Sequence, residues 1–302
     1  MKRILVIFCF SFLTQSLTAQ LKWINVDSLY QPLPSSVHVY RTNDSLNGKP
    51  NIAYYLIADL KDKHLVFDAD TTLNRRLTPT QFYEKNKQPL VVVNCTFFSF
   101  ETNRSLNVVI KDGKLISRNT KNVFRSAIGI NKKRKADIAW IRTDSLKKFA
   151  EAVQEPSFGI WFSTNRTTVQ TKRSDNFAKW KVETAVGGGP VLVQNGGVKI
   201  TNEEEKMFTG KAINDKHPRT AMGYTKDGKL IILVIQGRYS GIAEGATLND
   251  EAQILKDLGC REALNLDGGG SSCMLINGKN TITPSEKEIQ RPVPAVFLIQ
   301  TK

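Results

Sequence analysis

Short apolar runs separated by tight-turn residues are the feature that most constrains the fold of this chain. Asp112-Gly113, Asp227-Gly228 and Asn277-Gly278 each lie between runs rich in Val, Ile and Leu. Both residues of such pairs tolerate the positive φ angles of a two-residue hairpin turn, so the pattern predicts antiparallel strands. The predicted strands span residues 52–60, 89–94, 107–111, 127–130, 136–141, 190–194, 220–225, 229–236, 263–267, 273–276 and 294–300.

Three helices are predicted between these strands. Thr78 is a candidate N-cap followed by a proline, for a helix ending near Lys87. A second is predicted over 146–153, and a third runs from the cap Thr247 to Gly259. The expected fold class is therefore α+β, with two twisted, mainly antiparallel sheets and a few flanking helices.

The sequence also contains an internal similarity. Residues 125–130 (RSAIGI) match residues 219–224 (RTAMGY), and each run continues into a polar turn and an apolar strand. The hairpins around Gly113 and Gly196 fit the same two halves. We interpret this as two similar sheet units in one domain, an internal duplication; the alternative is that all hairpins look alike.

The N-terminus has the pattern of a secretory signal peptide. Lys2 and Arg3 precede the apolar stretch 4–13, and small residues lead to Ala19. The stretch is shorter than the roughly 20 residues that span a bilayer. We expect residues 1–19 to be a signal peptide, 20–302 a single domain without a membrane span, and the product to be exported to the periplasm or the extracellular space.

The formal net charge of +15 favours acidic partners. The basic residues are scattered, and the densest run, 131–135, falls at an expected hairpin turn, so the charge does not indicate a nucleic-acid binder. Beyond the signal peptide there are three cysteines, enough for one disulfide and a free thiol. Neither cysteine spacing nor the separated histidines predict a metal site, a cofactor or a Ser-His-Asp triad.

The segment Asp267-Gly268-Gly269-Gly270-Ser271 is the strongest candidate for chemistry. A buried strand would carry Asp267 to its end, and the bare glycines could direct several N–H groups into one anion-binding concavity. The segment lacks the lysine of a nucleotide-binding P-loop. A glycine-rich bulge in which Asp267 caps a turn is the structural alternative.

Other candidate ligand groups are expected around this loop. Gly188 and Gly189 belong to a second triple glycine before a strand. Arg219 and Arg238 fall at the same end of one predicted hairpin, where guanidinium groups could hold a phosphate. Asn94 ends an apolar strand as a polar contact, with two phenylalanines shortly after it.

Several motifs occur in an order that resembles the phosphodiester glycosidase family, which includes the lysosomal uncovering enzyme acting on mannose phosphodiesters. The motifs are Asn94-x-x-Phe97-Phe98, Gly187-Gly188-Gly189-Pro190, Pro218-Arg219-Thr220-Ala221, Gly237-Arg238, Leu266-Asp267-Gly268-Gly269-Gly270-Ser271 and Arg291-Pro292-Val293. The resemblance covers residues 50–300, and its most specific part is the aspartate–glycine–serine segment.

The resemblance implies hydrolysis of a sugar-1-phosphodiester, such as a GlcNAc-1-phosphodiester, at the anomeric carbon. It implies a cavity lined by Asn94, Arg219, Asp267, Ser271, Arg291 and the glycines that follow Asp267. The chain departs from the family pattern at two places. Cys95 and Thr96 stand where the family usually carries glycines, and Gln236 stands where relatives usually carry an aspartate.

In such a reaction, Asp267 would be the nucleophile, the base or the stabiliser of an oxocarbenium ion, and arginines would stabilise the leaving phosphate. The second carboxylate is open among Glu183, Glu244 and Asp250. Two other functions compete: a non-catalytic binding protein for phosphate-bearing or anionic exopolysaccharide, and a phosphodiesterase that cuts the P–O bond. A metal-dependent phosphatase fits less well, because no cluster of carboxylates and histidines is visible.

Overall fold

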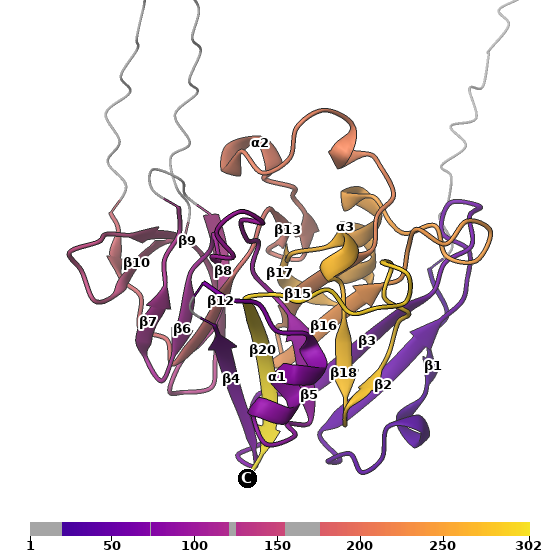
Figure 1. Ribbon diagram of the computed structural model, residues 1–302, viewed down its shortest axis with the longest axis horizontal. Helices are drawn as coiled ribbons and strands as arrows, with labels where there is room; N and C mark the ends of the chain where they lie inside the picture. Colours follow the sequence, from indigo (N-terminus) through magenta and orange to yellow (C-terminus); the bar gives the residue numbers. More distant parts are fainter. Residues whose placement is uncertain (1–19, 73, 121–124, 155–175) are drawn as a thin grey trace, which may run out of the picture.

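The computed structural model describes residues 20–72, 74–120, 125–154 and 176–302, and β-strands dominate it (Figure 1). The predicted signal peptide, residues 1–19, lies outside the described residues. In the described part of the chain, none of the helices has the length and apolar character needed to cross a bilayer.

The strands form three mainly antiparallel sheets, one more than the sequence analysis expected. In spatial order, the eight-stranded sheet contains β1 (Ile24–Asn25), β2 (Val37–Thr42), β3 (Ala53–Asp59), β16 (Lys229–Ile235), β15 (Arg219–Thr225), β17 (Cys260–Asn265), β13 (Val191–Gln194) and β14 (Gly197–Val198). The seven-stranded sheet contains β11 (Ala178–Lys179), β10 (Ala150–Val153), β9 (Ala136–Thr143), β8 (Arg125–Ile130), β12 (Thr184–Gly187), β6 (Val109–Lys111) and β7 (Lys114–Ser117). The five-stranded sheet contains β19 (Lys279–Asn280), β18 (Met274–Ile276), β5 (Val91–Asn94), β20 (Ala295–Thr301) and β4 (Leu65–Thr71).

Two of the three predicted helices are confirmed, together with their capping. The α-helices are α1 (Pro79–Lys85), α2 (Asn202–Glu205) and α3 (Leu248–Asp257), and single 3-10 turns are η1 (Asp27–Leu29), η2 (Gly210–Ile213) and η3 (Gly269–Ser271). Both α1 and α3 begin with a capping box, from Thr78 and Thr247 respectively. In such a box the cap side chain and the third helical residue satisfy each other's backbone N–H groups.

The helix predicted over 146–153 is wrong. Ala150–Val153 is strand β10, which pairs with β9 on one side and β11 on the other. Leu146, which the pattern placed on the apolar side of a helix, is 91% exposed. Three apolar residues with helical spacing are too weak a signal here, because pairing with β9 and β11 stabilises a strand instead of a helix.

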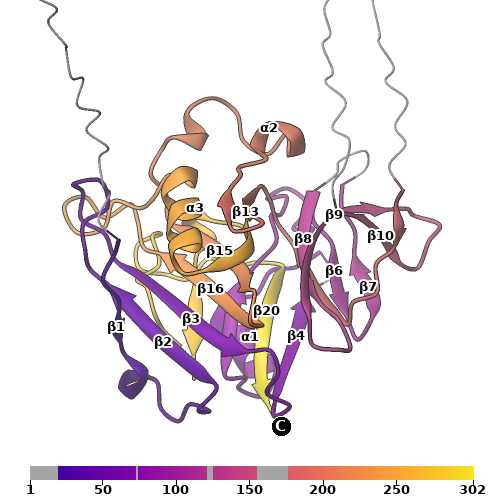
Figure 2. The same ribbon diagram turned by 180° about the vertical axis from the view of Figure 1, so that it is seen from behind.

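The core lies between the three sheets. One cluster of buried side chains contains residues of all of them, such as Leu56 of β3, Ile128 of β8 and Val93 of β5. Helix α3 covers the other face of the eight-stranded sheet, where Leu248 and Leu255 pack on Ala221 of β15 (Figure 2). Helix α1 packs through Phe82 on the outer face of the five-stranded sheet.

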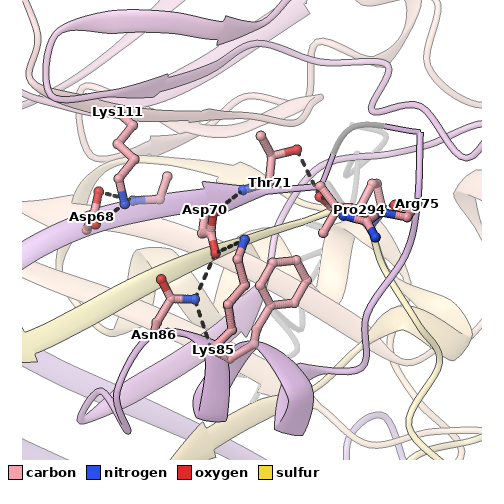
Figure 3. A network of polar contacts seen from close by, with 11 residues as sticks. Asp68, Asp70, Thr71, Arg75, Lys85, Asn86, Lys111 and Pro294 are labelled. Atoms are coloured by element: carbon pink, nitrogen blue, oxygen red, sulfur yellow. Dashed lines mark hydrogen bonds and ion pairs between the residues drawn. The ribbon is translucent and has the colours of Figure 1, made fainter.

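Polar contacts along β4 tie these layers together (Figure 3). The carboxylate of Asp68 pairs with Lys111 of β6 at 2.6 Å, and that of Asp70 pairs with Lys85 of α1 at 2.7 Å. Asn86, the residue after α1, also donates to Asp70 at 2.8 Å. These pairs connect β4 to the seven-stranded sheet on one side and to α1 on the other.

The two similar sequence segments lie in two units of strands that have the same spatial order. The first unit has the order β9-β8-β12-β6-β7 and the second has the order β16-β15-β17-β13-β14. In each unit, a strand that comes later in the sequence inserts between the two hairpins. Ile128 pairs with Val186 in the first, as Met222 pairs with Leu264 in the second. The shared order agrees with the expected duplication, which itself stays a prediction.

Candidate functional site

The backbone of Asp267 joins the ends of two strands from different sheets. It lies two residues after β17, and its N–H donates to Cys95 O at 2.8 Å. Asn94, the last residue of β5, donates from Nδ2 to Asp267 O. The ends of β5 and β17 therefore hold the backbone of the aspartate from both sides.

The Asp267 carboxyl has an unusual acidity. Burial raises its pKa to about 7, against the opposing effects of a hydrogen bond with Ser271, the charge of Arg291 and the N–H of Gly268. Its Oδ2 atom is buried and has no hydrogen-bond partner among the described residues. An acid whose pKa lies near neutral pH can both accept and return a proton, which is the property expected of a general acid or base.

Asn94 is completely buried, and both polar atoms of its side chain are hydrogen-bonded. Its Oδ1 atom accepts from Thr220 Oγ1 and from Cys273 N, both at 3.0 Å, while Nδ2 donates to Asp267. One side chain thus connects β5, β15 and the two ends of the glycine-rich loop. This geometry suits a residue that positions Asp267 better than one that touches a substrate.

Most of the amides around the triple glycine, which were expected to form a cradle for an anion, are hydrogen-bonded within the protein. Gly269 N donates to Pro218 O at 2.8 Å, while Ser271 N and Ser272 N donate to Gly268 O and Gly269 O within the turn η3, each at 3.2 Å. The Gly268 amide is directed to the Asp267 carboxylate. These N–H groups are already used by the protein itself.

The glycines instead make room for arginine side chains. A Cβ on Gly270 would lie 2.2 Å from Arg291 Nη2, and one on Gly269 would lie 3.0 Å from Arg238 Nη2. Gly269 also has a φ of +61°, a conformation that residues with side chains rarely adopt. The bare backbone lets two guanidinium groups approach the residues directly after Asp267.

Three arginines and one phenylalanine gather next to this loop; we call Arg76, Arg238 and Arg291 the arginine cluster. The Cζ atoms of Arg76 and Arg291 lie 5.6 Å and 5.3 Å from the centre of the Phe100 ring, which is 63% exposed. Burial lowers the pKa of Arg291, and the charges of Arg238 and Arg76 lower it further. Guanidinium groups this close together favour an anionic ligand.

Arg291 links the arginine cluster to Asp267. Its Nη1 donates to Ser271 Oγ at 3.3 Å, and Ser271, which is 1% exposed, hydrogen-bonds the Asp267 carboxylate. On its other side, Arg291 forms a two-fold contact with Glu286, one bond of which joins Nε and Oε2 at 3.1 Å. The chain Asp267–Ser271–Arg291–Glu286 is thus continuous.

Glu286 is the second carboxylate in this network, and the sequence analysis missed it. The three candidates named there make contacts elsewhere: Glu183 lies near Lys132, Glu244 accepts from Gly241 N, and Asp250 caps α3. Arg76, Phe100 and Glu286 all lie in loops far apart in the sequence. The pairing of Glu286 with Arg291 five residues later was the one local signal available.

Arg219 does not join the arginine cluster. Its side chain turns toward α3, where Nε donates to Ala246 O at 2.8 Å and Nη2 to Asp215 O at 3.1 Å. The carboxylates that act on its charge are those of Glu251 and Asp250. Arg219 and Arg238 do lie at the same end of the β15–β16 hairpin, as predicted, because Arg219 pairs with Ile235.

The second triple glycine packs against β17 and a buried carboxyl group. Gly189 N donates to Asn265 O at 2.8 Å, and a Cβ on Gly188 would lie 2.4 Å from the same oxygen. Glu205, which is 1% exposed, lies next to Gly189 and accepts from Ser126 N, Val191 N and Thr201 Oγ1. These glycines allow close packing of the two units, and their backbone is engaged in that packing.

The departures from the family pattern are accommodated inside the protein. Cys95 is fully buried with a free thiol, as are Cys260 and Cys273, so these three cysteines form no disulfide. Gln236 is 6% exposed, and its Oε1 accepts from Thr283 N at 2.9 Å. Within residues 20–72, 74–120, 125–154 and 176–302, no three His, Cys, Asp or Glu side chains group as metal ligands would.

Known proteins resemble this chain in sequence over limited stretches. A 74-residue stretch is 42% identical to the SPbeta prophage-derived uncharacterized protein YomE of Bacillus subtilis, covering 24% of this chain and 11% of that protein. A 103-residue stretch is 32% identical to the N-acetylglucosamine-1-phosphodiester alpha-N-acetylglucosaminidase of Mus musculus, covering 32% of this chain and 20% of the mouse protein. The matches thus span a fifth or less of these relatives' length.

Solved structures share the fold over most of the chain. The catalytic domain of zebrafish N-acetylglucosamine-1-phosphodiester alpha-N-acetylglucosaminidase, auto-inhibited by its pro-peptide, superimposes with a TM-score of 0.63 at 19% identity, covering 94% of this chain and 89% of that one. A hypothetical protein from Synechocystis gives a TM-score of 0.65 at 16% identity, covering 88% and 62%. The family model for phosphodiester glycosidases matches residues 87–300. The chain therefore belongs to the phosphodiester glycosidase family.

Proposed function

We propose that this protein hydrolyses a sugar-1-phosphodiester at the anomeric carbon, releasing a free sugar and a phosphomonoester. The observation that carries the proposal is the position of the Asp267 carboxyl group, which lies beside the arginine cluster and whose pKa burial raises to about 7. The family of the chain points to the same chemistry. A GlcNAc-1-phosphodiester is the substrate to test first, because two relatives carry that activity in their names.

The arginine cluster would bind the phosphodiester. Arg291 and Arg238 lie against the glycines that follow Asp267, so a phosphate held between them would bring its sugar close to that carboxylate. Guanidinium groups form paired hydrogen bonds with phosphate oxygens and stabilise the charge that builds up as the phosphate leaves. The exposed ring of Phe100 offers an apolar surface for one face of the sugar.

Asp267 would act as the general base. Its carboxylate takes a proton from a water molecule, the water oxygen bonds to the anomeric carbon, and the bond from that carbon to the phosphate oxygen breaks. The electron pair leaves with the phosphomonoester, whose charge the arginines neutralise. A phosphate is a good leaving group, so this scheme needs no second carboxyl group to protonate it. Glu286 would keep Arg291 in place.

The test is hydrolysis of a synthetic GlcNAc-1-phosphodiester in water enriched in oxygen-18. Cleavage at carbon places the label in the free sugar, whereas cleavage of the P–O bond places it in the phosphate and would support a phosphodiesterase instead. Asp267→Asn should remove activity while its circular dichroism spectrum is retained. Asp257→Asn, on the exposed end of α3, is the matched control and should keep full activity.

One observation favours a second function, the binding of phosphate-bearing or anionic exopolysaccharide without turnover. Gln236 replaces the acid that relatives usually carry, and it is committed to Thr283 N. The net charge of +15 would also attract anionic glycans. Binding of the phosphodiester with no product from the wild-type protein would support this function. In either case, we propose that the protein acts outside the cytoplasm.

A further inference from the structure

A cavity lies against the loop that follows β5 and carries Phe100. Its volume is about 290 Å³, and its lining includes Thr71 and Thr72 at the end of β4, Arg104 and Ser105 from the loop after β5, and Arg118 after β7. This is close to the lower end of the size range of small-molecule sites, roughly 300 Å³. The described residues that line it include neither aspartate nor glutamate.

Two guanidinium groups at this cavity are available to a ligand. Arg118 is held by two backbone carbonyls, since Nε donates to Asp144 O at 3.4 Å and Nη2 to Lys147 O at 3.2 Å, and its Nη1 is left over. The Arg104 side chain has no hydrogen bond or ion pair with any described residue; its backbone oxygen accepts from Ser99 N. One arginine is therefore fixed in place and the other can close on a ligand.

The hydroxyl groups of the cavity supply acceptors. Thr71 donates its hydroxyl proton to Pro294 O at 2.9 Å, and Thr72 donates its own to Arg75 O. Ser105 likewise donates to Asn107 O at 3.0 Å. Ser105 Oγ also accepts from Asn107 N at 3.3 Å, so one of its lone pairs is already used. Its other lone pair and those of the two threonines remain for donors such as sugar hydroxyl groups. The nearest acid along the chain, Asp70, is neutralised by Lys85 (Figure 3).

We propose that this cavity binds a sugar unit that carries an anionic group, a phosphate or a carboxylate. The arginines would hold the anionic group, and the threonine and serine oxygens would accept from the ring hydroxyls. This site is separate from Asp267 and does not depend on the proposed hydrolysis. In an anionic polysaccharide it would hold a second charged unit of the same chain, because the loop between Asn94 and Val109 lines both places.

The experiment is an NMR titration of the full chain with glucose 6-phosphate, glucuronate, glucose and inorganic phosphate. The amide signals of Ile116 and Ser117, which line the cavity, should shift with the two anionic sugars. Arg104→Gln should raise the Kd at least about tenfold, as expected for loss of a charge-assisted contact. Arg261→Gln, an exposed arginine on β17, is the matched control and should leave the Kd unchanged.

Arg291→Gln separates this site from the one around Asp267. The shifts at Ile116 and Ser117 should persist in that variant, whatever happens to hydrolysis. An unchanged Kd in Arg104→Gln, or loss of these shifts in Arg291→Gln, would overturn the proposal. Glucose or inorganic phosphate binding as tightly as glucose 6-phosphate would also overturn it, since the site would then not recognise an anionic sugar.

Discussion

Arg291 donates a hydrogen bond to Ser271 Oγ across 3.3 Å, and this contact joins the arginine cluster to the residue that hydrogen-bonds Asp267. The charge of Arg291 also lowers the pKa of Asp267, which burial raises. The affinity of the site for an anion and the acidity of its carboxyl group are therefore coupled through one side chain.

The pH dependence of hydrolysis should report Asp267. As a general base it must be ionised, and its pKa is about 7. We expect kcat/KM to fall about tenfold per pH unit below that value and to level off above it. In Arg291→Gln the pH below which kcat/KM falls should be higher, because the positive charge that lowers the pKa of Asp267 is gone. A profile that is flat from pH 5 to 8 would contradict the role of Asp267.

Replacing Arg291 should change KM, whereas replacing Arg219 should change the melting temperature. Arg291→Gln removes a proposed phosphate ligand, so we expect KM to rise about tenfold or more with little change in the melting temperature. Arg219→Gln breaks buried bonds to Ala246 O and Asp215 O, so it should lower the melting temperature. Steady-state kinetics well below that temperature should then give a normal KM. A normal KM in Arg291→Gln would exclude Arg291 from binding.

Gly270→Ala should reproduce the loss of Arg291. The added Cβ would lie 2.2 Å from Arg291 Nη2 and 2.5 Å from Glu286 Oε1, so the guanidinium must move. Combining this change with Arg291→Gln should cost no more activity than either change alone. Gly197→Ala is the matched control, because the added Cβ would lie 3.6 Å from Gln194 O, an ordinary van der Waals contact. Full additivity of the two changes would show that they act independently.

Asn94→Ala should destabilise the fold and misplace Asp267. It leaves Thr220 Oγ1, Cys273 N and Asp267 O without their partner in the core, at a cost of about 2–4 kcal/mol. Urea denaturation measures this loss. Thr220→Val removes one of these bonds and should cost less. A variant of unchanged stability would show that the network can be replaced, for example by water.

Glu251 should make the stability of the protein depend on pH. It is fully buried on α3, both carboxylate oxygens have no hydrogen-bond partner among the described residues, and burial raises its pKa to about 8. Since this carboxyl group ionises near pH 4.5 in the unfolded chain, the folded state loses stability as the pH rises from there to about 8.

Glu251→Gln removes this effect. The variant should match the wild type at pH 4 and gain on it by about 1.4 kcal/mol per pH unit up to pH 8, measured by urea denaturation. Gln253→Glu, which adds an ionisable group at a partly exposed position of the same helix, is a useful comparison. An equal difference between Glu251→Gln and the wild type at pH 4 and pH 8 would mean that Glu251 is ionised in the folded protein.

Local sequence signals predicted the local structure well. The capping residues Thr78 and Thr247 begin α1 and α3, and the expected turn at 131–135 connects β8 to β9. Signals that depend on distant partners were less informative. The segment 146–153 has helical spacing, but pairing with β9 makes its second half a strand. The division into three sheets depends on pairings such as β4 with β20, which no local pattern encodes.

The candidate site shows the same limit. Asp267 and Asn94 were identified because each was predicted to end an apolar strand, and the structure brings the Asn94 side chain to the Asp267 backbone. The direction of the Arg219 side chain depends on the position of α3, and the contributions of Arg76 and Phe100 depend on how two loops meet. The glycines after Asp267 were expected to expose amides, whereas the structure uses them to admit arginines.

The common strand order of the two units gives the domain two equivalent positions at the ends of inserted strands. Counting three residues on from the paired positions Val186 and Leu264 reaches Gly189 in one unit and Asp267 in the other. The proposed general base, Asp267, thus lies at one position, and a residue without a side chain, Gly189, lies at the other. A side chain at Gly189 would meet Glu205 Oε2 at 2.5 Å and would be strained by the φ of +121° there, so the backbone of the first unit excludes the acid that the second unit carries.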